Sequence, residues 1–154
     1  MGTLKCQTHQ IQTVMPNITF QEEKEINIEE LLHLYNDAGW VAYTSDPGTL
    51  EKAIKNSQYV LTARDNDKLV GLIRTVGDGL TIVYIQDILV LKDYRRQKIG
   101  TLLMTKTLEK FRHVRQKVLL TDDTEETRGF YESLGFEVCD KTGLVSFVKL
   151  ENKR

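Results

Sequence analysis

The chain of 154 residues is 40% apolar and 28% charged, the proportions of one ordinary globular domain, and its net charge of −1 provides no overall positive field for nucleic acid or a membrane. Its two cysteines have neither metal-ligand nor CxxC spacing, so a reduced, cytoplasmic location without a structural metal is expected. No apolar run reaches the ~18 residues of a membrane span, and the N-terminus lacks the core of a signal peptide.

The N-terminal third of the chain predicts one strand and two helices. Residues 1–15 show no periodic pattern, and we expect a disordered or cloning-derived extension before a single domain at 16–154. Asn27 is a suitable N-cap for the first helix, and an Asp-Pro-Gly turn at 46–48 precedes the second. The expected elements are a strand over 17–21 and helices over about 28–36 and 49–57.

Strand patterns dominate the middle of the chain. Turn residues at 65–68 and 77–79 separate three runs, over 59–64, 69–76 and 80–91. In the last run, Ile82, Tyr84, Ile88 and Val90 alternate with Val83, Ile85, Leu89 and Leu91. A run that is apolar on both alternating faces is typical of a central strand that is covered on both sides.

The C-terminal part of the chain mixes helices and strands. The expected elements are a helix over about 98–112, a strand over 118–121, a helix from an Asp123 cap to Gly135, and a hairpin of strands at 136–139 and 144–150. Together with the preceding patterns, this order predicts a mixed α/β domain.

The junction between the long apolar run and the following helix carries the most chemical information. A helix begins with backbone N–H groups that have no partner within the helix, and its dipole makes this end positive. Lys92, Arg95, Arg96 and Lys98 add positive charge, so the junction is suited to bind a phosphate. Helical spacing places Gly100 at the centre of the buried face, where the lack of a Cβ lets the helix approach the sheet.

Two segments resemble motifs of the GNAT superfamily of N-acetyltransferases. Residues 95–100, RRQKIG, resemble its acetyl-CoA pyrophosphate loop, Q/R-x-x-G-x-G/A, with Lys98 in the place of the first glycine. We expect this lysine to have helical backbone angles and to point outward. Residues 129–137, GFYESLGFE, resemble the superfamily's helix that ends in F-Y-x-x-L-G-F.

The resemblance implies a fold, a reaction and a set of binding residues. The implied fold is a single GNAT-like α/β (mixed α+β) domain with a central, mostly antiparallel sheet of about six or seven strands and helices on both faces. The implied reaction moves the acetyl group of acetyl-CoA, the cosubstrate, to a primary amine by direct attack in a ternary complex. Members often pair, so a homodimer is expected by analogy. The residues implied to bind acetyl-CoA are Leu89, Val90, Arg95, Arg96, Gln97, Lys98, Ile99, Gly100 and Thr101.

Amine acetylation also needs groups that handle protons. An alkylamine with a pKa near 10.4 is only about one part in 2,500 neutral at pH 7, so something must accept its proton. Asp87 interrupts an apolar strand and is the candidate base; its alternative roles are to cap backbone amides or to pair with a basic side chain, and a water chain is the competing route for the proton. By resemblance, Tyr131 is the acid that protonates the CoA sulfur, and its alternative role is packing.

The acceptor is less well defined by the sequence. Trp40 and Tyr43 lie between the first two predicted helices, where the superfamily walls the acceptor pocket, so they are candidate substrate contacts, and Trp40 could equally anchor the core. A small-molecule amine and a protein lysine are both compatible acceptors. Two other function classes stay open: a non-catalytic acyl-CoA sensor, and an unrelated nucleotide-binding domain, which the lack of a G-x-x-x-x-G-K-[ST] motif disfavours. No nucleic-acid or membrane partner is expected.

Overall fold

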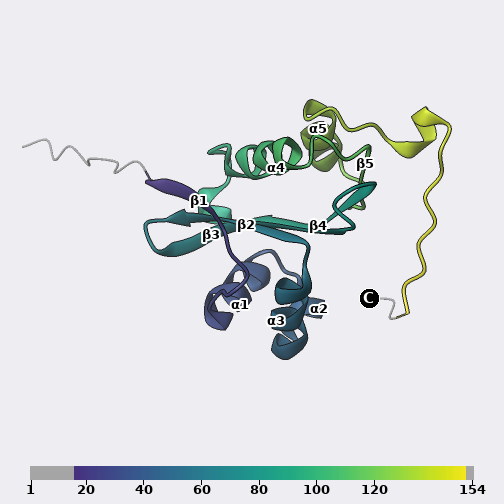
Figure 1. Ribbon diagram of the computed structural model, residues 1–154. Helices are drawn as coiled ribbons and strands as arrows, with labels where there is room; N and C mark the ends of the chain where they lie inside the picture. Colours follow the sequence, from purple (N-terminus) through teal and green to yellow (C-terminus); the bar gives the residue numbers. More distant parts are fainter. Residues whose placement is uncertain (1–15, 152–154) are drawn as a thin grey trace, which may run out of the picture.

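A central β-sheet separates two groups of helices in the computed structural model, which describes residues 16–151 (Figure 1). The strands are β1 (Ile18–Glu22), β2 (Tyr59–Asp65), β3 (Lys68–Gly77), β4 (Ile82–Val90) and β5 (Gln116–Leu119). The helices are α1 (Ile28–Asp37), α2 (Val41–Thr44), α3 (Pro47–Asn56), α4 (Ile99–Lys110) and α5 (Glu125–Ser133), with 3-10 turns η1 (Lys92–Tyr94) and η2 (Cys139–Thr142).

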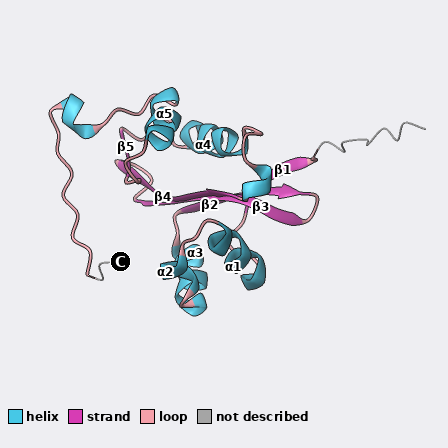
Figure 2. Cartoon of the chain, turned by 180° about the vertical axis from the view of Figure 1, so that it is seen from behind, coloured by secondary structure: helices cyan, strands magenta, loops and turns pink. Residues whose placement is uncertain are grey.

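The sheet follows the chain order β1-β2-β3-β4-β5. All neighbouring strands are antiparallel except β4 and β5, which are parallel and are joined by a crossover through α4. Helices α1, α2 and α3 cover one face of the sheet, and α4 and α5 cover the other (Figure 2). The predicted fold class, a mixed α/β domain with helices on both faces, is confirmed, with five strands in place of about six or seven.

Local sequence signals explain where most helices begin and which faces they bury. The Asn27 side chain caps α1 by accepting from the backbone N–H groups of Glu29 and Glu30, at 2.8 and 3.2 Å. Helix α4 turns an apolar face to the sheet, as its spacing predicts. The buried residues of α4 and its C-cap are Ile99, Leu103, Met104, Thr107 and Phe111.

Several predicted boundaries are wrong. The segment between the first two predicted helices contains the additional short helix α2, and α3 begins at Pro47 because Asp46 acts as its N-cap. Thr124, rather than Asp123, caps α5 through a reciprocal pair of hydrogen bonds with Thr127. The predicted C-terminal hairpin does not form; η2 and irregular chain occupy the segment after α5, which accounts for the smaller number of strands.

A bulge in β4 decides which of its side chains face each helix layer. Arg74 of β3 pairs with Asp87, but the next residue, Thr75, pairs with Ile85, so Gln86 is an extra residue in β4. An inserted residue reverses the alternation of side chains that a regular strand would have.

The helix contacts identify the two faces of β4. A Cβ added at Gly71 of β3 would lie 3.2 Å from Cδ1 of Leu103 in α4, so Gly71 and its pairing partner face α4. By the same pairing, the β4 residues that face α4 are Val83, Ile85, Ile88 and Val90, and those that face α1 are Tyr84, Asp87 and Leu89. The strict alternation predicted for 80–91 is therefore wrong across the bulge.

The described residues, 16–151, include no helix that is both long and apolar enough to cross a membrane. Residues 1–15, predicted to form an extension, lie outside the described part of the chain.

Candidate functional site

The parallel strands β4 and β5 lie side by side over only the first half of β4. Pairing between β4 and β5 ends at Ile85 and Leu119, whereas β4 continues to Val90. Over this second half, β4 pairs only with β3, so its edge toward β5 has no strand partner among the described residues. Leu89 and Val90, which were predicted to offer backbone groups to acetyl-CoA, lie in this half, three and four residues beyond the bulge at Gln86.

The basic loop between β4 and α4 presents a row of free backbone N–H groups. The first helical hydrogen bond of α4 runs from Leu102 N–H to the Lys98 carbonyl at 2.9 Å. The backbone N–H groups of residues 97–101 donate to no protein acceptor within the described part of the chain. Unpaired amides at a helix start form an anion site, and the helix dipole adds positive potential.

Two residues of this loop have left-handed backbone angles. Arg96 has a φ of 62°, and Lys98, the N-cap of α4, has φ 62° and ψ 14°. The expectation that Lys98 has right-handed helical angles is therefore wrong; it stands in the left-handed region, which glycine occupies without steric cost. Left-handed residues in a loop turn successive N–H groups toward one concave side, which is a backbone arrangement suited to anions.

A pair of substitutions at Lys98 measures this steric cost directly. Both Lys98→Gly and Lys98→Ala remove the charge, and they differ only by a Cβ. We expect the glycine variant to be more stable by about 1 kcal/mol, because a Cβ is disfavoured at positive φ. Urea denaturation of the two variants measures the difference. At right-handed helical angles the order would be reversed, with alanine the more stable.

Gly100 brings α4 and α5 together beside the end of β4. A Cβ added at Gly100 would lie 3.7 Å from Cζ of Phe130 and 3.8 Å from Cγ2 of Val90. These are ordinary contact distances, so the site has room for a methyl group and little more. The start of α4 therefore lies close to the sheet at Val90, and Phe130, the residue before Tyr131, takes part in the same contact.

Tyr131 lies half-buried in an aromatic group on α5. Its ring packs edge-on against Phe130, at 5.1 Å between ring centroids, and against Phe136, at 5.9 Å. Burial raises the pKa of the Tyr131 hydroxyl, and the neighbouring Thr121 hydroxyl offsets part of this rise. Tyr131 therefore keeps its proton at neutral pH. It stands close to Thr121, just beyond the end of β5.

The opposite face of the sheet holds a buried polar cluster around Asp87. Asp87 is 2% exposed, and its carboxylate forms an ion pair with Arg74 of β3. Tyr35 of α1 donates its hydroxyl to Asp87 Oδ2 at 2.8 Å, and Tyr43 of α2 donates to Oδ1 at 3.0 Å. Arg74 also donates to the Ser57 hydroxyl at 3.3 Å. The cluster thus ties α1, α2 and the segment after α3 to the central strands.

Tyr43 is the member of this cluster that reaches the molecular surface. Its hydroxyl accepts from Gln86 Nε2 at 3.1 Å while it donates to Asp87, so it links the bulge residue to the buried carboxylate. Burial and the nearby Asp87 charge raise the pKa of Tyr43, which keeps the hydroxyl neutral. Trp40 is half-buried and packs against the rings of Tyr35 and Tyr43, at 6.0 and 5.8 Å between centroids.

Sequence reasoning did not identify Arg74 and Tyr35 as partners of Asp87. Arg74 is a charged residue within the apolar run 69–76, the same signal that identified Asp87, and the two residues flank one predicted turn. Tyr35 gave no separate signal, because a tyrosine at helical spacing among leucines predicts an ordinary core residue.

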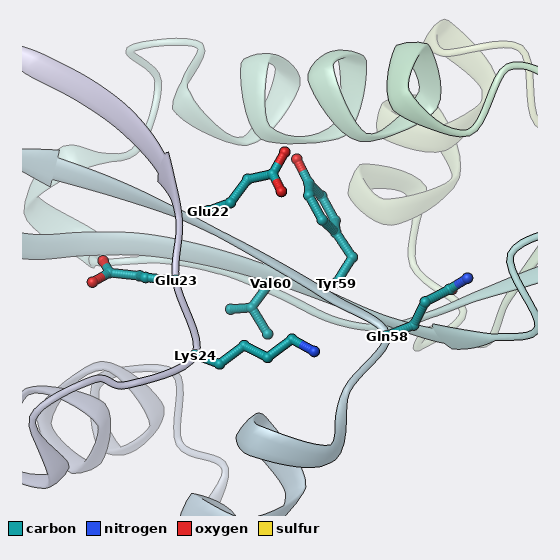
Figure 3. Close-up of a pocket in the computed structure, with 6 residues that line it drawn as sticks. All are labelled: Glu22, Glu23, Lys24, Gln58, Tyr59 and Val60. Carbon is teal, nitrogen blue, oxygen red and sulfur yellow. The ribbon is translucent and has the colours of Figure 1, made fainter.

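A shallow hollow at the other edge of the sheet does not belong to this site. It has a volume of about 200 Å³ and is lined by Glu22, Glu23, Lys24, Gln58, Tyr59 and Val60. Glu22 and Tyr59 point toward α4, whereas Lys24 and Val60 point toward the helices on the opposite face (Figure 3). Since these side chains do not converge, the hollow offers no set of groups that could hold one ligand.

Comparison with known proteins identifies the family. The family model described as an acetyltransferase (GNAT) domain matches residues 19–150. The chain belongs to the GNAT family of acetyltransferases.

Several solved structures are similar to this GNAT domain. The GNAT-family acetyltransferase SP0256 from Streptococcus pneumoniae is 38% identical, with a TM-score of 0.78 over 88% of this chain and 99% of that one. Protein SA2161 from meticillin-resistant Staphylococcus aureus is 25% identical, with a TM-score of 0.71 over 86% of this chain and 99% of that one. An aminoglycoside acetyltransferase from an uncultured soil sample, solved with sisomicin, shares the fold at 19% identity and a TM-score of 0.63, over 89% of this chain and 96% of that one. Among curated proteins, no sequence matches the chain.

Family membership removes one of the function classes that the sequence left open. The chain is an acyltransferase of the GNAT type, and an unrelated nucleotide-binding domain is no longer supported. In the part of the chain that the structure describes, no group of three or more His, Cys, Asp or Glu side chains is placed to hold a metal ion.

Proposed function

We propose that this chain transfers the acetyl group of acetyl-CoA to a primary amine, by direct attack in a ternary complex. The observation that carries the proposal is the row of free N–H groups at 97–101, at the start of α4 and next to the separated half of β4. When bound, acetyl-CoA supplies the activated thioester whose acetyl group is transferred. The remaining chemistry falls to the side chains and backbone groups of the chain.

The β4–α4 loop fits a diphosphate in both charge and geometry. The proposed donors are the backbone N–H groups of Gln97, Lys98, Ile99, Gly100 and Thr101. The side chains of Arg95 and Arg96 are exposed beside them and supply two positive charges. Leu89 and Val90 were both expected to offer backbone groups to the pantetheine amides. Leu91 N–H donates to the Val70 carbonyl of β3, so by alternation the groups of Leu89 also face β3, and those of Val90, on the edge that β5 leaves unpaired, are the proposed partners.

Arg95 lies between these two parts of the proposed site. Its Nε donates to the Val90 carbonyl at 3.4 Å, a long and weak hydrogen bond. We therefore expect this bond to be exchanged when a diphosphate and an amide chain occupy the loop and the strand edge.

The amine proton has a hydrogen-bonded route into the sheet. Asp87 is buried and its two carboxylate oxygens are engaged, so direct contact with an acceptor is not available to it. In our proposal, Tyr43 accepts the amine proton as it passes its own proton to Asp87 Oδ1, across the 3.0 Å bond. The raised pKa of Tyr43 is consistent with this role, since the hydroxyl is neutral before and after the transfer. Trp40, packed on Tyr43, is proposed to form part of the acceptor wall.

Tyr131 is the proposed acid for the departing thiolate. The replacement Tyr131→Phe is expected to lower kcat about 100-fold, the lower range for one general acid, because burial keeps this hydroxyl protonated and available. Acetyl-CoA affinity should change by less than about threefold, since the ring and its aromatic contacts remain. Steady-state kinetics and calorimetric titration of acetyl-CoA measure the two quantities separately. Equal losses in kcat and affinity would assign Tyr131 to packing.

The acceptor can be identified by following thiol release from acetyl-CoA. A panel should include simple alkylamines, polyamines, the aminoglycoside sisomicin and a lysine-containing peptide, because the acceptor wall does not distinguish these amines. We expect turnover with at least one amine and a rate that rises with pH as more of the amine becomes neutral. Tight acetyl-CoA binding without turnover of any amine would instead favour the acyl-CoA sensor.

A further inference from the structure

The bulge in β4 places two consecutive side chains on one face of the sheet. In a regular strand, Gln86 and Asp87 would point to opposite faces. Because Gln86 is the inserted residue, both side chains reach Tyr43 of α2, on the face covered by α1, α2 and α3 (Figure 2). Gln86 is half-buried, and it is the first residue of β4 beyond the pairing with β5. The bulge therefore brings a side-chain amide beside a buried carboxylate.

The amide and the carboxylate meet at a single hydroxyl, that of Tyr43. Gln86 Nε2 lies 3.1 Å from this oxygen, and Asp87 Oδ1 lies 3.0 Å from it. A phenol has one proton to donate and an oxygen that can accept, whereas an ionised carboxylate only accepts. The Tyr43 hydroxyl therefore donates its proton to Asp87, and its oxygen accepts from the Gln86 amide.

The orientation of the Gln86 amide follows from the donors and acceptors around it. Asp87 Oδ2 already accepts from Tyr35 and Arg74, so Oδ1 depends on Tyr43 for its hydrogen bond. If the Gln86 carbonyl oxygen faced the hydroxyl, two acceptors would share one proton and one of them would lack a donor. With the N–H group toward the hydroxyl, the carboxylate, the hydroxyl and the amide are all satisfied.

The Gln86 amide also affects the acidity of the Tyr43 hydroxyl. Burial and the charge of Asp87 raise the pKa of Tyr43, and the hydrogen bond from Gln86 acts in the opposite direction. A donor at the phenol oxygen stabilises the negative charge that develops there as the proton moves toward Asp87. Because an amide does not titrate, Gln86 has this effect without adding a second charge beside the carboxylate.

We propose that Gln86 is a positioning residue, which holds the Tyr43 hydroxyl with its proton directed at Asp87 and the open side of its oxygen free for the acceptor amine. This inference rests on the proposed function, in which Tyr43 relays the amine proton.

The proton transfer leaves Gln86 unchanged. One proton leaves the amine nitrogen for the Tyr43 oxygen as the hydroxyl proton of Tyr43 crosses to Asp87 Oδ1. The nitrogen lone pair forms the new bond to the acetyl carbon, the carbon–sulfur bond breaks, and the thiolate takes the proton of Tyr131. Tyr43 ends as it began and Asp87 ends protonated. Gln86 acts only by selecting the hydroxyl orientation from which the proton can reach Asp87.

The first test removes the amide and keeps most of its bulk. Gln86→Leu is expected to lower kcat about 10-fold, the rate effect of one ordinary hydrogen bond, and to change the KM of the amine less than about threefold. The assay uses the amine of the panel that the parent acetylates fastest. The matched control is Gln116→Leu, the same replacement at an exposed position of β5, which should keep the parental kcat.

A second background separates positioning from packing. In Tyr43→Phe, the further change Gln86→Leu should lower kcat by less than about twofold, because no hydroxyl is left to position. A structural role of Gln86 would lower kcat equally in both backgrounds. An unchanged kcat in Gln86→Leu alone, or the same 10-fold loss with and without the Tyr43 hydroxyl, would overturn the proposal.

The variant Gln86→Glu tests the direction of the hydrogen bond through pH. A protonated carboxyl still donates to Tyr43, whereas the ionised form accepts the Tyr43 proton and competes with Asp87 for it. The ratio of kcat in Gln86→Glu to kcat in the parent should therefore fall between about pH 5 and 8 as the new carboxyl ionises. The other titratable and charged groups of the cluster are present in both proteins, and they are Tyr35, Tyr43, Arg74, Tyr84 and Asp87. A ratio that stays constant or rises with pH would overturn the proposal, since the position would then need no donor.

The same measurements keep this inference apart from the proposed function. A parent that acetylates no amine of the panel overturns both. An active parent, with Tyr43→Phe impaired and Gln86→Leu unchanged, retains the proton relay and removes Gln86 from it. Circular dichroism melts verify that the variants are folded, and Gln86→Glu, which keeps the size of the side chain, carries the test if Gln86→Leu does not fold.

Discussion

Replacing Asp87 by asparagine is expected to lower the free energy of unfolding by about 3–5 kcal/mol, the cost of leaving one partner of a buried ion pair uncompensated. Asparagine has nearly the same size, so the packing around it is retained. Arg74 would keep its charge in a site where it is 6% exposed, with only the Ser57 hydroxyl and an amide to face it. Urea denaturation of the two proteins measures the difference.

The variant Tyr43→Phe is the matched control for this loss. It removes one hydroxyl at the surface of the cluster and leaves the ion pair between Asp87 and Arg74 in place. We expect it to cost about 1 kcal/mol in stability but to lower kcat about 100-fold if the hydroxyl carries the amine proton. Full activity in Tyr43→Phe would exclude the relay, and a stability loss below about 1 kcal/mol in Asp87→Asn would show that the ion pair is not a structural element.

Asp87 also illustrates how far the sequence can predict a site. A carboxylate in an apolar strand was recognised as costly unless paired or used, and pairing with a basic side chain was one of the alternatives. The partner could not be named, because the pairing of β3 with β4 shifts by one residue at Gln86. A strand sequence does not reveal where a bulge falls, and one inserted residue reverses the faces of everything beyond it.

Features of the helices that depend on neighbouring residues were easier to predict from the sequence than the partner of Asp87. The cap of α1 and the buried face of α4 follow from side chains that act on their own neighbours, so they could be predicted from the sequence. The left-handed angle at Lys98 could not, since lysine gives no local signal for positive φ. The C-terminal hairpin was predicted from a β pattern at 144–150, but a strand needs a partner as well as a pattern, and among residues 16–151 no strand pairs with this segment.

Replacing Gly100 by tryptophan is expected to weaken acetyl-CoA binding about 10- to 100-fold, whereas Gly100→Ala should bind as the parent does. The neighbouring atoms of Phe130 and Val90 lie 3.7 and 3.8 Å from the position of an added Cβ, so a methyl group fits and an indole does not. The indole must push α5 away from α4 or turn toward the loop. Overpacking of this kind costs about 1–3 kcal/mol. If the loop carries this cost, the free energy of acetyl-CoA binding falls by the same amount, which corresponds to the stated loss in affinity.

The alanine variant makes this test specific for geometry. Alanine stabilises a helix by about 0.5–1 kcal/mol relative to glycine, so Gly100→Ala should melt no earlier than the parent. Calorimetric titration of acetyl-CoA gives the affinities, and circular dichroism shows whether the tryptophan variant is folded. If folded Gly100→Trp binds acetyl-CoA as tightly as the parent, the proposal that the pyrophosphate lies at the start of α4 is wrong, because the indole is then attached to one of the residues whose amides should hold it.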